Sequence, residues 1–244
     1  MRSLLKQYLP PEIRSKLRSR QPSFMFRKSS FSQCGEDLLI AFVLDLIHGS
    51  RPKKYLDVGA NHPFHLSNTA LLYASGGHGV LVEPDPYLAG LLRSKRPRDK
   101  VLPYGVHFSG QESADFFVLD SPTLNTFSHQ EMERYVSMGH RVTDTLKVEL
   151  RNINMVLEIS GTLDFMSIDI EGMDEEILRM IDWSIYRPTC ICVETITYER
   201  KNEPKKLYGI IEFMNRQDYM VYADTFINSI FVDRQQWAAR WNQG

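Results

Sequence analysis

From residue 31 onward the chain alternates between two hydrophobic patterns. Short apolar runs that end in glycine or polar residues indicate buried strands, and apolar residues at helical spacing indicate helices. The predicted strands are residues 54–58, 79–83, 101–107, 116–119, 145–150, 163–170 and 188–194, with a closing hairpin over 219–223 and 229–232. The predicted helices are residues 37–47, 68–75, 87–96, 153–159, 173–181 and 204–217. This alternation predicts an α/β three-layer sandwich, in which helices cover both faces of a mostly parallel sheet.

Two segments depart from the alternation. Residues 120–143 are polar and lack periodicity, which is typical of a lid or a binding loop. Residues 1–30 hold eight Lys or Arg and one acid, a local charge of +7. We therefore expect a basic leader over residues 1–30 and a single domain over residues 31–244. The leader is either a solvated or edge-packed segment, or a basic amphipathic helix in weak contact with a membrane surface.

The net charge of the whole chain is close to zero, so long-range electrostatic attraction does not draw nucleic acid to it. Removing the leader's groups from the totals of 29 basic and 30 acidic residues leaves 21 basic and 29 acidic, a net charge of −8. The net charge of the chain is −1, and 43% of its residues are hydrophobic, which is ample for one core. We expect a small-molecule or glycan acceptor site rather than a nucleic-acid surface.

Cysteine usage and hydropathy favour a cytoplasmic protein. Three cysteines are an odd number, and Cys190 and Cys192 alternate with apolar neighbours as core residues of a strand do. A reducing compartment is the natural inference. No apolar stretch is long enough for a transmembrane segment, and the leader lacks the apolar core of a signal peptide.

Acidic residues at two predicted strand ends indicate a ligand that contains a nucleoside. Asp57 lies in an apolar strand that runs into Gly59, and burial of its carboxylate requires a partner, either turn amides or a ligand ammonium group. Glu83 follows 26 residues later at the end of the next strand. Dinucleotide folds place an acid at about this interval to bind the ribose hydroxyls.

The turn after Gly59 argues against a dinucleotide. A pyrophosphate needs a glycine-rich cradle, whereas this turn has one glycine followed by bulky residues, and Asp57 would repel phosphate. An acid beside the turn suits a ligand with an ammonium and a sulfonium group, as in S-adenosylmethionine. A nucleotide-linked oxidoreductase and a non-catalytic methyltransferase-like binding module remain the alternatives.

Four motifs in order resemble the FkbM-type family of S-adenosylmethionine-dependent methyltransferases. They are SQCGED (32–37), LDVGAN (56–61), VEPDP (82–86) and DFMSIDIEG (164–172), and the likeness spans residues 31–232. The resemblance implies a seven-stranded, Rossmann-like methyltransferase sheet with a reversed C-terminal hairpin, and methylation of a hydroxyl oxygen on a sugar or polyketide-derived scaffold. It also implies that residues 32–37, which include Gln33, Glu36 and Asp37, fold over the active site.

The candidate cofactor contacts lie in and near these motifs. The resemblance carries them onto Asp57, Gly59, Asn61 and Glu83, and we add Ser67, Asn68, Pro84 and Asp169 as candidates. Ser67 is equally well explained as the N-cap of the helix predicted over 68–75. Many family members have a second glycine soon after the residue at Asn61, but this chain has His62-Pro63-Phe64-His65, which stiffens the turn.

Methyl transfer to a hydroxyl requires a base or a metal near the acceptor. The candidate bases are Asp169, Glu171, His62 and His65. Asp169 is the first choice because apolar neighbours would raise its pKa, and His62 is the second. Asn125 and His129, in the irregular segment, are weaker candidates for contacts with the acceptor.

Three carboxylates also suggest a metal site. If the strand over 163–170 continues, Asp169 and Glu171 share one side of it, and Glu194 ends the next strand. Such a group would bind Mg²⁺ or Mn²⁺. The alternative is that Glu171 caps the following helix.

Overall fold

The computed structural model describes residues 27–107, 111–170, 172–198 and 203–242, and the basic leader lies mostly outside them. Helices are α2 (Glu36–His48), α3 (Ala70–Ala74), α4 (Pro86–Lys95), α5 (His129–Ser137), α6 (Ile153–Ser160), α7 (Asp174–Met180), α8 (Tyr208–Arg216) and α9 (Arg234–Ala239), with short 3₁₀ turns at Pro122–Leu124 and Arg240–Asn242. Strands are β1 (Lys54–Val58), β2 (His78–Val82), β3 (Lys100–Leu102), β4 (Gly105–His107), β5 (Ser113–Leu119), β6 (Val142–Asn152), β7 (Phe165–Ile168), β8 (Cys190–Glu194), β9 (Ile196–Tyr198), β10 (Pro204–Lys206), β11 (Tyr219–Asp224) and β12 (Asn228–Asp233).

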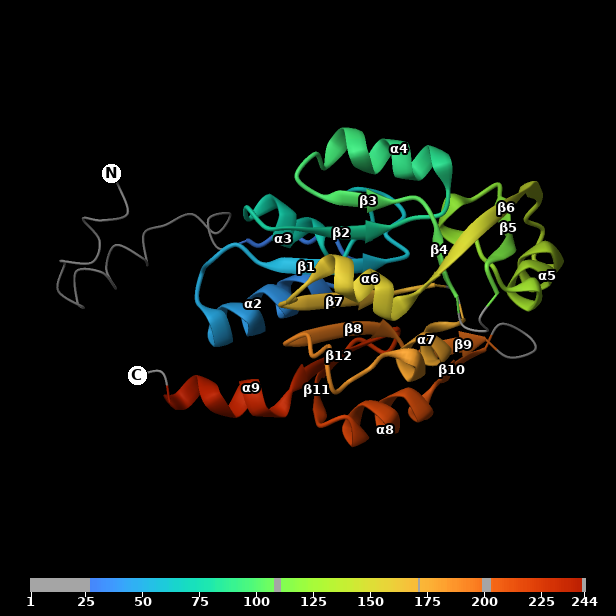
Figure 1. Cartoon of the computed structure of the whole chain (residues 1–244). Helices are drawn as coiled ribbons and strands as arrows, with labels where there is room; N and C mark the ends of the chain where they lie inside the picture. The colour runs from blue at the N-terminus through green and yellow to red at the C-terminus, as the bar shows by residue number, and fades with distance from the viewer. Residues whose placement is uncertain (1–26, 108–110, 171, 199–202, 243–244) are drawn as a thin grey trace.

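The central sheet has seven strands in the order β11-β12-β8-β7-β1-β2-β3, and it runs across the middle of Figure 1. β1 pairs in parallel with β2 and β7, and β8 pairs in parallel with β7. β12 is antiparallel to both β8 and β11. This confirms the predicted seven-stranded, mostly parallel sheet with a C-terminal antiparallel hairpin.

Helices cover both faces of the sheet, and the two-residue period of the strands assigns each side chain to a face. Leu56 and Val58 pack with α6, α7 and α8. Tyr55 lies on the opposite face with α2, α3 and α4. Asp57 also points to this second face, because it is two residues from Tyr55. Cys190 and Cys192 are fully buried here, as predicted.

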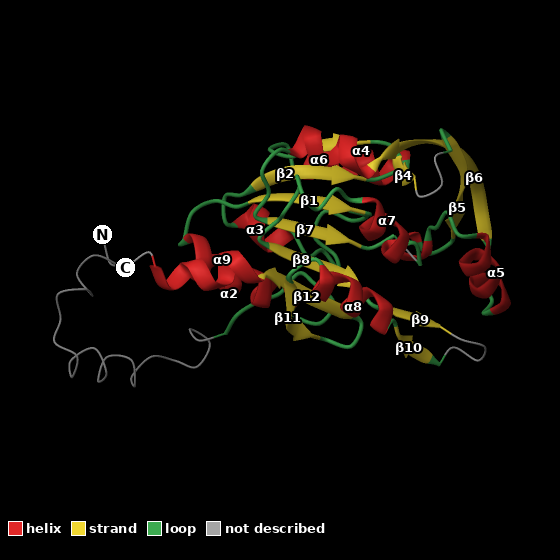
Figure 2. Cartoon of the chain, turned by 60° about the horizontal axis from the view of Figure 1, so that its bottom comes forward, coloured by secondary structure: helices red, strands yellow, loops and turns green. Residues whose placement is uncertain are grey.

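An insert between β3 and β7 forms a separate layer at the carboxyl ends of the strands. β4 pairs with β6 in parallel and β5 pairs with β6 in antiparallel orientation, which gives a three-stranded sheet beside α5. In Figures 1 and 2 the arrowheads of β1, β2 and β7 point toward this insert.

The insert corrects two predictions. The strand predicted over 101–107 is two strands, because the chain leaves the central sheet after β3 and joins the insert as β4. The segment over 120–143 is not irregular throughout, since it contains α5. Ser128 caps this helix by accepting a hydrogen bond from the Glu131 amide. This N-cap serine is a helix-start signal, but it was not recognised among the many polar residues of the segment.

Other differences lie at element ends. The helix predicted over 204–217 begins only at Tyr208, because residues 204–206 pair with β9 as an unpredicted strand. The helix predicted over 68–75 begins at Ala70 with Thr69 at its N-cap, so Ser67 is not the cap. α9, after the hairpin, was not predicted.

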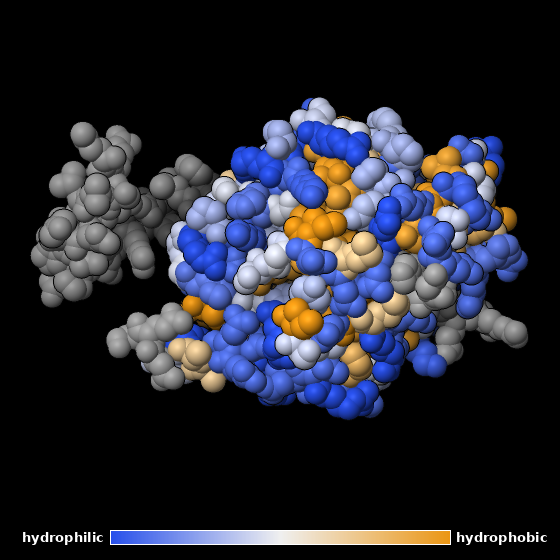
Figure 3. All heavy atoms as spheres, viewed as in Figure 1, coloured by the Kyte–Doolittle hydropathy of each residue, from blue (hydrophilic) through white to orange (hydrophobic). Residues whose placement is uncertain are grey.

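The described surface mixes polar and apolar side chains, as the view in Figure 3 shows. Across the described ranges, none of the helices has the length and apolar character needed to cross a membrane.

Candidate active site

A cavity of about 400 Å³ lies between the carboxyl ends of the strands and the insert. Its volume is within the range of small-molecule sites. One wall is formed by residues at the ends of β1, β2, β7 and β8, and the other by residues of the insert. Parallel strands direct their carboxyl ends to one edge of the sheet, which is where ligands bind in this class of fold.

Gly59 allows the turns after β1 and β7 to meet. Its φ is +85°, and a Cβ atom added there would lie 1.9 Å from the backbone oxygen of Asp169. A larger residue would push the two strand ends apart. Gly59 thus brings Asp57 and Asp169 to the same cavity, in addition to lining it.

Glu83 follows β2 and is 3% exposed. Its two carboxylate oxygens accept hydrogen bonds from the backbone amides of Asn61 and Asp85, each at 2.8 Å. Burial, together with the nearby carboxylates of Asp85 and Asp57, raises the pKa of Glu83 to about 7, although the two amide hydrogen bonds oppose the rise. The bonds fix the orientation of the carboxylate, and each oxygen keeps a lone pair for a ligand hydroxyl.

Asp57 lines the same cavity and is 5% exposed. Its Oδ2 accepts a hydrogen bond of 2.5 Å from the hydroxyl of Thr69. The sequence left open whether the turn amides bind the carboxylate of Asp57. The amides of Gly59 and Ala60 do not, because they donate to the carbonyl of Val82. Burial raises the pKa of Asp57, while the Thr69 hydrogen bond and the positive charge of Arg96 lower it.

Asp169 follows β7 and presents its side chain to the cavity. Its carboxylate has no hydrogen-bond partner among the described residues. The side chain has surface open to the cavity, but the surrounding protein partly desolvates it, which disfavours the charged form. The negative charges of Asp57 and Glu36 also disfavour the charged form. Together they raise its pKa to about 6. An unpartnered carboxylate with a raised pKa is suited to accept a proton.

Two asparagines attach the insert to the turns after β1 and β2. The side-chain amide of Asn61 donates to the carbonyl of Pro122 at 2.9 Å. The side-chain amide of Asn125 donates to Asp85 Oδ2 at 3.1 Å, and its oxygen accepts the amide of Leu119. The segment around the 3₁₀ turn is thereby held against the turns after β1 and β2, and its role as a lid stays a prediction.

The insert wall of the cavity is mainly apolar. Phe116 and Phe127 contact each other with ring centroids 4.7 Å apart, and both line the cavity. Tyr135 and Met138, at the end of α5, also line it. Sequence analysis missed all four, because no local pattern distinguishes a cavity-facing aromatic residue from a core one.

The segment before α2 also reaches the cavity. Gln33 lines it, whereas Glu36 and Asp37 hold the segment in place. Asp37 accepts hydrogen bonds from the Phe31 amide and from two serine hydroxyls. Glu36 accepts from the Cys34 amide and from Thr225 and Asn228 near the final hairpin. The position of Gln33 agrees with the expectation that this segment folds over the site.

All eight proposed cofactor contacts line the cavity, namely Asp57, Gly59, Asn61, Ser67, Asn68, Glu83, Pro84 and Asp169. Two of them also have internal partners. Asn68 donates to the hydroxyl of Ser167 at 3.1 Å, and Ser67 lies 3.5 Å from a guanidinium nitrogen of Arg96. The role of each in cofactor binding stays a prediction.

Two of the three histidine candidates, His62 and His129, do not line the cavity. His62 Nδ1 accepts hydrogen bonds from the amides of Phe64 and His65, so it stabilises its own turn. His65 lines the cavity in its place. His129 is exposed and lies beside Glu133 on α5. The placement therefore gives no support to His62 as a base or to His129 as an acceptor contact, whereas Asn125 does line the cavity.

The predicted metal site is not supported. Within the described ranges, no three His, Cys, Asp or Glu side chains are placed to hold a metal ion. Asp169 and Glu194 both line the cavity, but Glu171 lies outside the described residues. β7 ends at Ile168, so the assumption that a continuing strand aligns Asp169 with Glu171 was wrong.

Residues 57–221 match the family model of the methyltransferase FkbM domain. This chain belongs to that family. The match covers 165 of the 244 residues and includes Asp57, Glu83 and Asp169, whereas the SQCGED motif lies before it. The FkbM domain makes the chain an S-adenosylmethionine-dependent methyltransferase, and gives no support to the oxidoreductase alternative. No curated protein matches the sequence.

Solved structures of other methyltransferases show a distant likeness. A TehB-like S-adenosylmethionine-dependent methyltransferase from Corynebacterium glutamicum has 11% identity and a TM-score of 0.43, covering 90% of this chain and 96% of its own. The O-methyltransferase from Bacillus cereus has 13% identity and a TM-score of 0.37, covering 90% and 88%. The 1,6-didemethyltoxoflavin-N1-methyltransferase from Burkholderia thailandensis has 11% identity and a TM-score of 0.40, covering 82% and 77%. The assignment rests on the family match alone.

The cavity fits S-adenosylmethionine. Glu83 offers a fixed carboxylate for the ribose hydroxyls, and the free oxygen of Asp57 offers an anion for the ammonium group. The turn after β1 has no glycine cradle for a pyrophosphate. The donor set thus agrees with a cationic nucleoside.

Proposed function

We propose that this FkbM methyltransferase transfers a methyl group to a hydroxyl oxygen of a sugar or another polyhydroxylated small molecule. S-adenosylmethionine supplies the methyl group on a sulfonium centre. The observation that carries the proposal is Asp169, a carboxylate open to the cavity, without a partner among the described residues and with a pKa raised to about 6. A hydroxyl needs such a base, because it is a poor nucleophile until its proton is removed.

The residues around Asp169 support a polar acceptor. Gln33, His65, Glu194 and Asn228 line the cavity and present amide, imidazole and carboxylate groups. Such groups bind hydroxyls by hydrogen bonds. Phe127, a half-buried residue on the insert wall, adds an apolar surface that suits the C–H face of a sugar ring.

In this proposal each acid has one task. Glu83 binds the ribose, Asp57 binds the ammonium group, and Asp169 accepts the hydroxyl proton of the acceptor. Most of the rate acceleration comes from holding the hydroxyl in line with the methyl group. A metal bound by Asp169, Glu171 and Glu194 stays a prediction, and activity that is unchanged by a chelator would exclude it.

The first test is ligand binding. We expect calorimetric titration to show binding of S-adenosylhomocysteine and not of NAD. Binding of NAD alone would favour the oxidoreductase alternative and contradict the proposal.

The second test is product analysis. The protein is incubated with S-adenosylmethionine and a panel of sugars, polyols, phenols and amines, and the position of the new methyl group is determined by mass spectrometry and NMR. We expect O-methylated products from the sugars or polyols. Methylation of the amines alone would contradict the proposal, and cofactor binding without any transfer would favour the non-catalytic module.

A further inference from the structure

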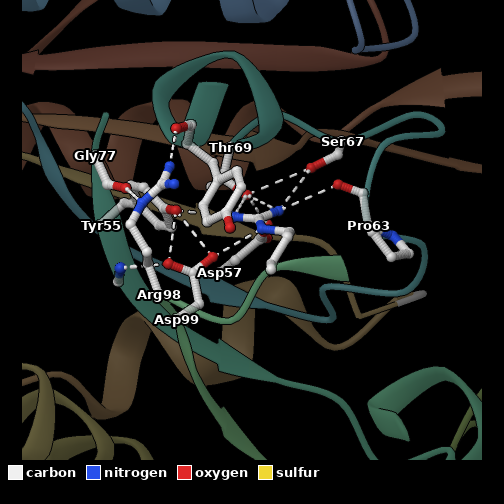
Figure 4. Close-up of polar contacts among 11 residues, drawn as sticks. Tyr55, Asp57, Pro63, Ser67, Thr69, Gly77, Arg98 and Asp99 are labelled. Carbon is white, nitrogen blue, oxygen red and sulfur yellow. Dashed lines mark hydrogen bonds and ion pairs between the residues drawn. The ribbon is translucent and has the colours of Figure 1, made fainter. Parts of the chain in front are cut away.

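Arg96, at the end of α4, is a fully buried cation whose role the methyltransferase reaction does not explain. Its Nε donates to Asp99 Oδ2 at 2.7 Å, and one terminal nitrogen donates to the Tyr55 hydroxyl at 3.0 Å. Both terminal nitrogens donate to Thr69 Oγ1, each at 3.0 Å. Figure 4 shows its partners Tyr55, Thr69 and Asp99 close together, with Asp57 beside them.

The chemistry of these groups fixes the direction of one hydrogen bond. A guanidinium group only donates, so the two bonds from Arg96 occupy both lone pairs of the Thr69 hydroxyl. Its single proton has two acceptors within reach, Asp57 Oδ2 at 2.5 Å and Ser67 Oγ at 3.4 Å, and the shorter contact with the carboxylate takes it. Asp57 Oδ2 must act as an acceptor in this arrangement.

The other oxygen of Asp57 is free to bind a ligand. Asp57 Oδ1 has no partner among the described residues. Every buried side-chain nitrogen or oxygen in the described part of the chain has a hydrogen bond. Oδ1 is therefore open, and Asp57 lines the cavity.

We propose that Arg96, acting through the hydroxyl of Thr69, is a positioning residue that favours the ionised form of Asp57 and turns its free oxygen toward the ammonium group of the cofactor. This inference rests on the proposed role of Asp57 in binding that ammonium group. Arg96 touches neither cofactor nor acceptor in this scheme. The positive charge of Arg96 acts at a distance, because an electrostatic interaction is strong where water is excluded. This attraction opposes the free-energy cost of burying the carboxylate of Asp57.

Several other ionisable groups face Asp57 from the packed elements. Asp99 before β3, Glu83 after β2, Asp169 after β7 and Cys192 on β8 interact with it electrostatically. Tyr55 shares its face of β1, and Glu36 on α2 acts on Asp169 and Cys192. Of the charged groups among these and Arg96, only Arg96 is a cation, so the ionised form of Asp57 depends on it. Loss of the link through Thr69 should raise the pKa of Asp57 and move cofactor binding to higher pH.

The experiment compares two ligands that differ in the ammonium group. S-adenosylhomocysteine has the amino-acid moiety, and 5′-methylthioadenosine has the same nucleoside and sulfur without it. Thr69→Val keeps the shape of the side chain but removes the hydroxyl, whereas Thr69→Ser keeps the hydroxyl. We expect Thr69→Val to weaken S-adenosylhomocysteine binding by about tenfold and to leave methylthioadenosine binding within about twofold.

Two further readouts separate positioning from a structural role. Thr69→Ser should restore most of the affinity for S-adenosylhomocysteine. The pH midpoint of S-adenosylhomocysteine binding should be higher in Thr69→Val than in the wild type. Equal loss of affinity for both ligands, or an unchanged midpoint, would overturn the inference. If Thr69→Val does not fold, Arg96→Lys is measured in the same way, since lysine keeps the charge but cannot make both bonds to Thr69.

Asp57→Asn distinguishes failure of this inference from failure of the proposed function. If Asp57→Asn binds S-adenosylhomocysteine as tightly as the wild type, the ammonium role of Asp57 is wrong, and the inference fails with it. If Asp57→Asn selectively loses S-adenosylhomocysteine while Thr69→Val does not, only the inference about Arg96 is wrong.

Discussion

The two walls of the cavity differ in both chemistry and origin. The strand-end wall presents carboxylates, Asp57, Glu83 and Asp169, each at the end of a parallel strand. The insert wall presents mainly apolar side chains such as Phe116 and Tyr135. A charged wall can bind and activate a ligand through fixed electrostatics, whereas an apolar wall selects a ligand by shape. Under the proposed function, cofactor binding and proton transfer belong to the strand ends, and acceptor selection belongs to the insert.

The walls also differ in how they are held. The strand ends are joined by the sheet itself and by the close approach at Gly59. The insert contacts the turns after β1 and β2 through the hydrogen bonds of Asn61 and Asn125. Changes in the strand-end wall should therefore have large effects on binding and chemistry, and changes in the insert should have smaller effects that depend on the acceptor.

Asp169→Asn should have the largest effect. Asparagine keeps the shape of the side chain but cannot accept the proton of the acceptor hydroxyl. We expect kcat to fall by about 10²- to 10⁴-fold, with S-adenosylhomocysteine affinity retained. Asp115→Asn, an exposed acid on β5, is the matched control. Near-normal turnover in Asp169→Asn would exclude it as the base.

Glu83→Ala should come next. Removal of the carboxylate takes away both contacts with the ribose hydroxyls and leaves the amides of Asn61 and Asp85 without an acceptor. We expect S-adenosylhomocysteine affinity to fall by about 100-fold in calorimetry. Glu212→Ala, an exposed acid on α8, should bind normally. If Glu83→Ala retains wild-type affinity, the ribose role is refuted.

The pH dependence of turnover should show an intermediate effect. The pKa of Asp169 is raised to about 6, and only its ionised form accepts a proton. Activity is therefore present above this pKa and is lost as the pH falls through it. The bound cationic cofactor shifts the midpoint to a lower pH. With saturating cofactor, kcat/KM for the acceptor should fall by up to about tenfold for each pH unit below the midpoint. The same acidic limb in Asp169→Asn would assign it to another group.

Met138→Ala should have the smallest effect, on the insert wall. The loss of apolar contact should raise KM for the acceptor by a few-fold, roughly 1 kcal/mol, and leave S-adenosylhomocysteine affinity unchanged. Val136→Ala is the matched control, because Val136 is similarly exposed at the same end of α5 but does not line the cavity. A loss of cofactor affinity in Met138→Ala would show that the insert wall also belongs to the cofactor site.

The strand-end wall was largely predictable because its signals are local. Each strand of the central sheet is a short apolar run. One acid, Asp57, lies near the end of β1, and the other two directly follow β2 and β7, so all three are visible in the sequence. Parallel pairing then brings the strand ends together without further information. The limits of this reasoning appear at β9 and β10, whose sequences have no clear alternation and which, among the described strands, pair with each other alone.

The roles of single residues were less predictable. His62 lies next to the right motif, but its ring faces its own turn amides rather than the cavity. Arg96 ends a helix in the usual way for a basic residue, and no local pattern shows that it is buried or that it reaches Thr69. These contacts join residues 27 positions apart in sequence, so only the packed structure brings them together.

By itself, the sequence determined the succession of the main strands and helices along the chain and placed three acids at strand ends. It could do so because hydrophobic periodicity and turn residues are local properties of the chain. The tertiary structure alone decided which side chains face the cavity and which cation lies behind Asp57. The physical reason is that both outcomes depend on how distant segments pack, and packing sets burial, hydrogen-bond partners and charge.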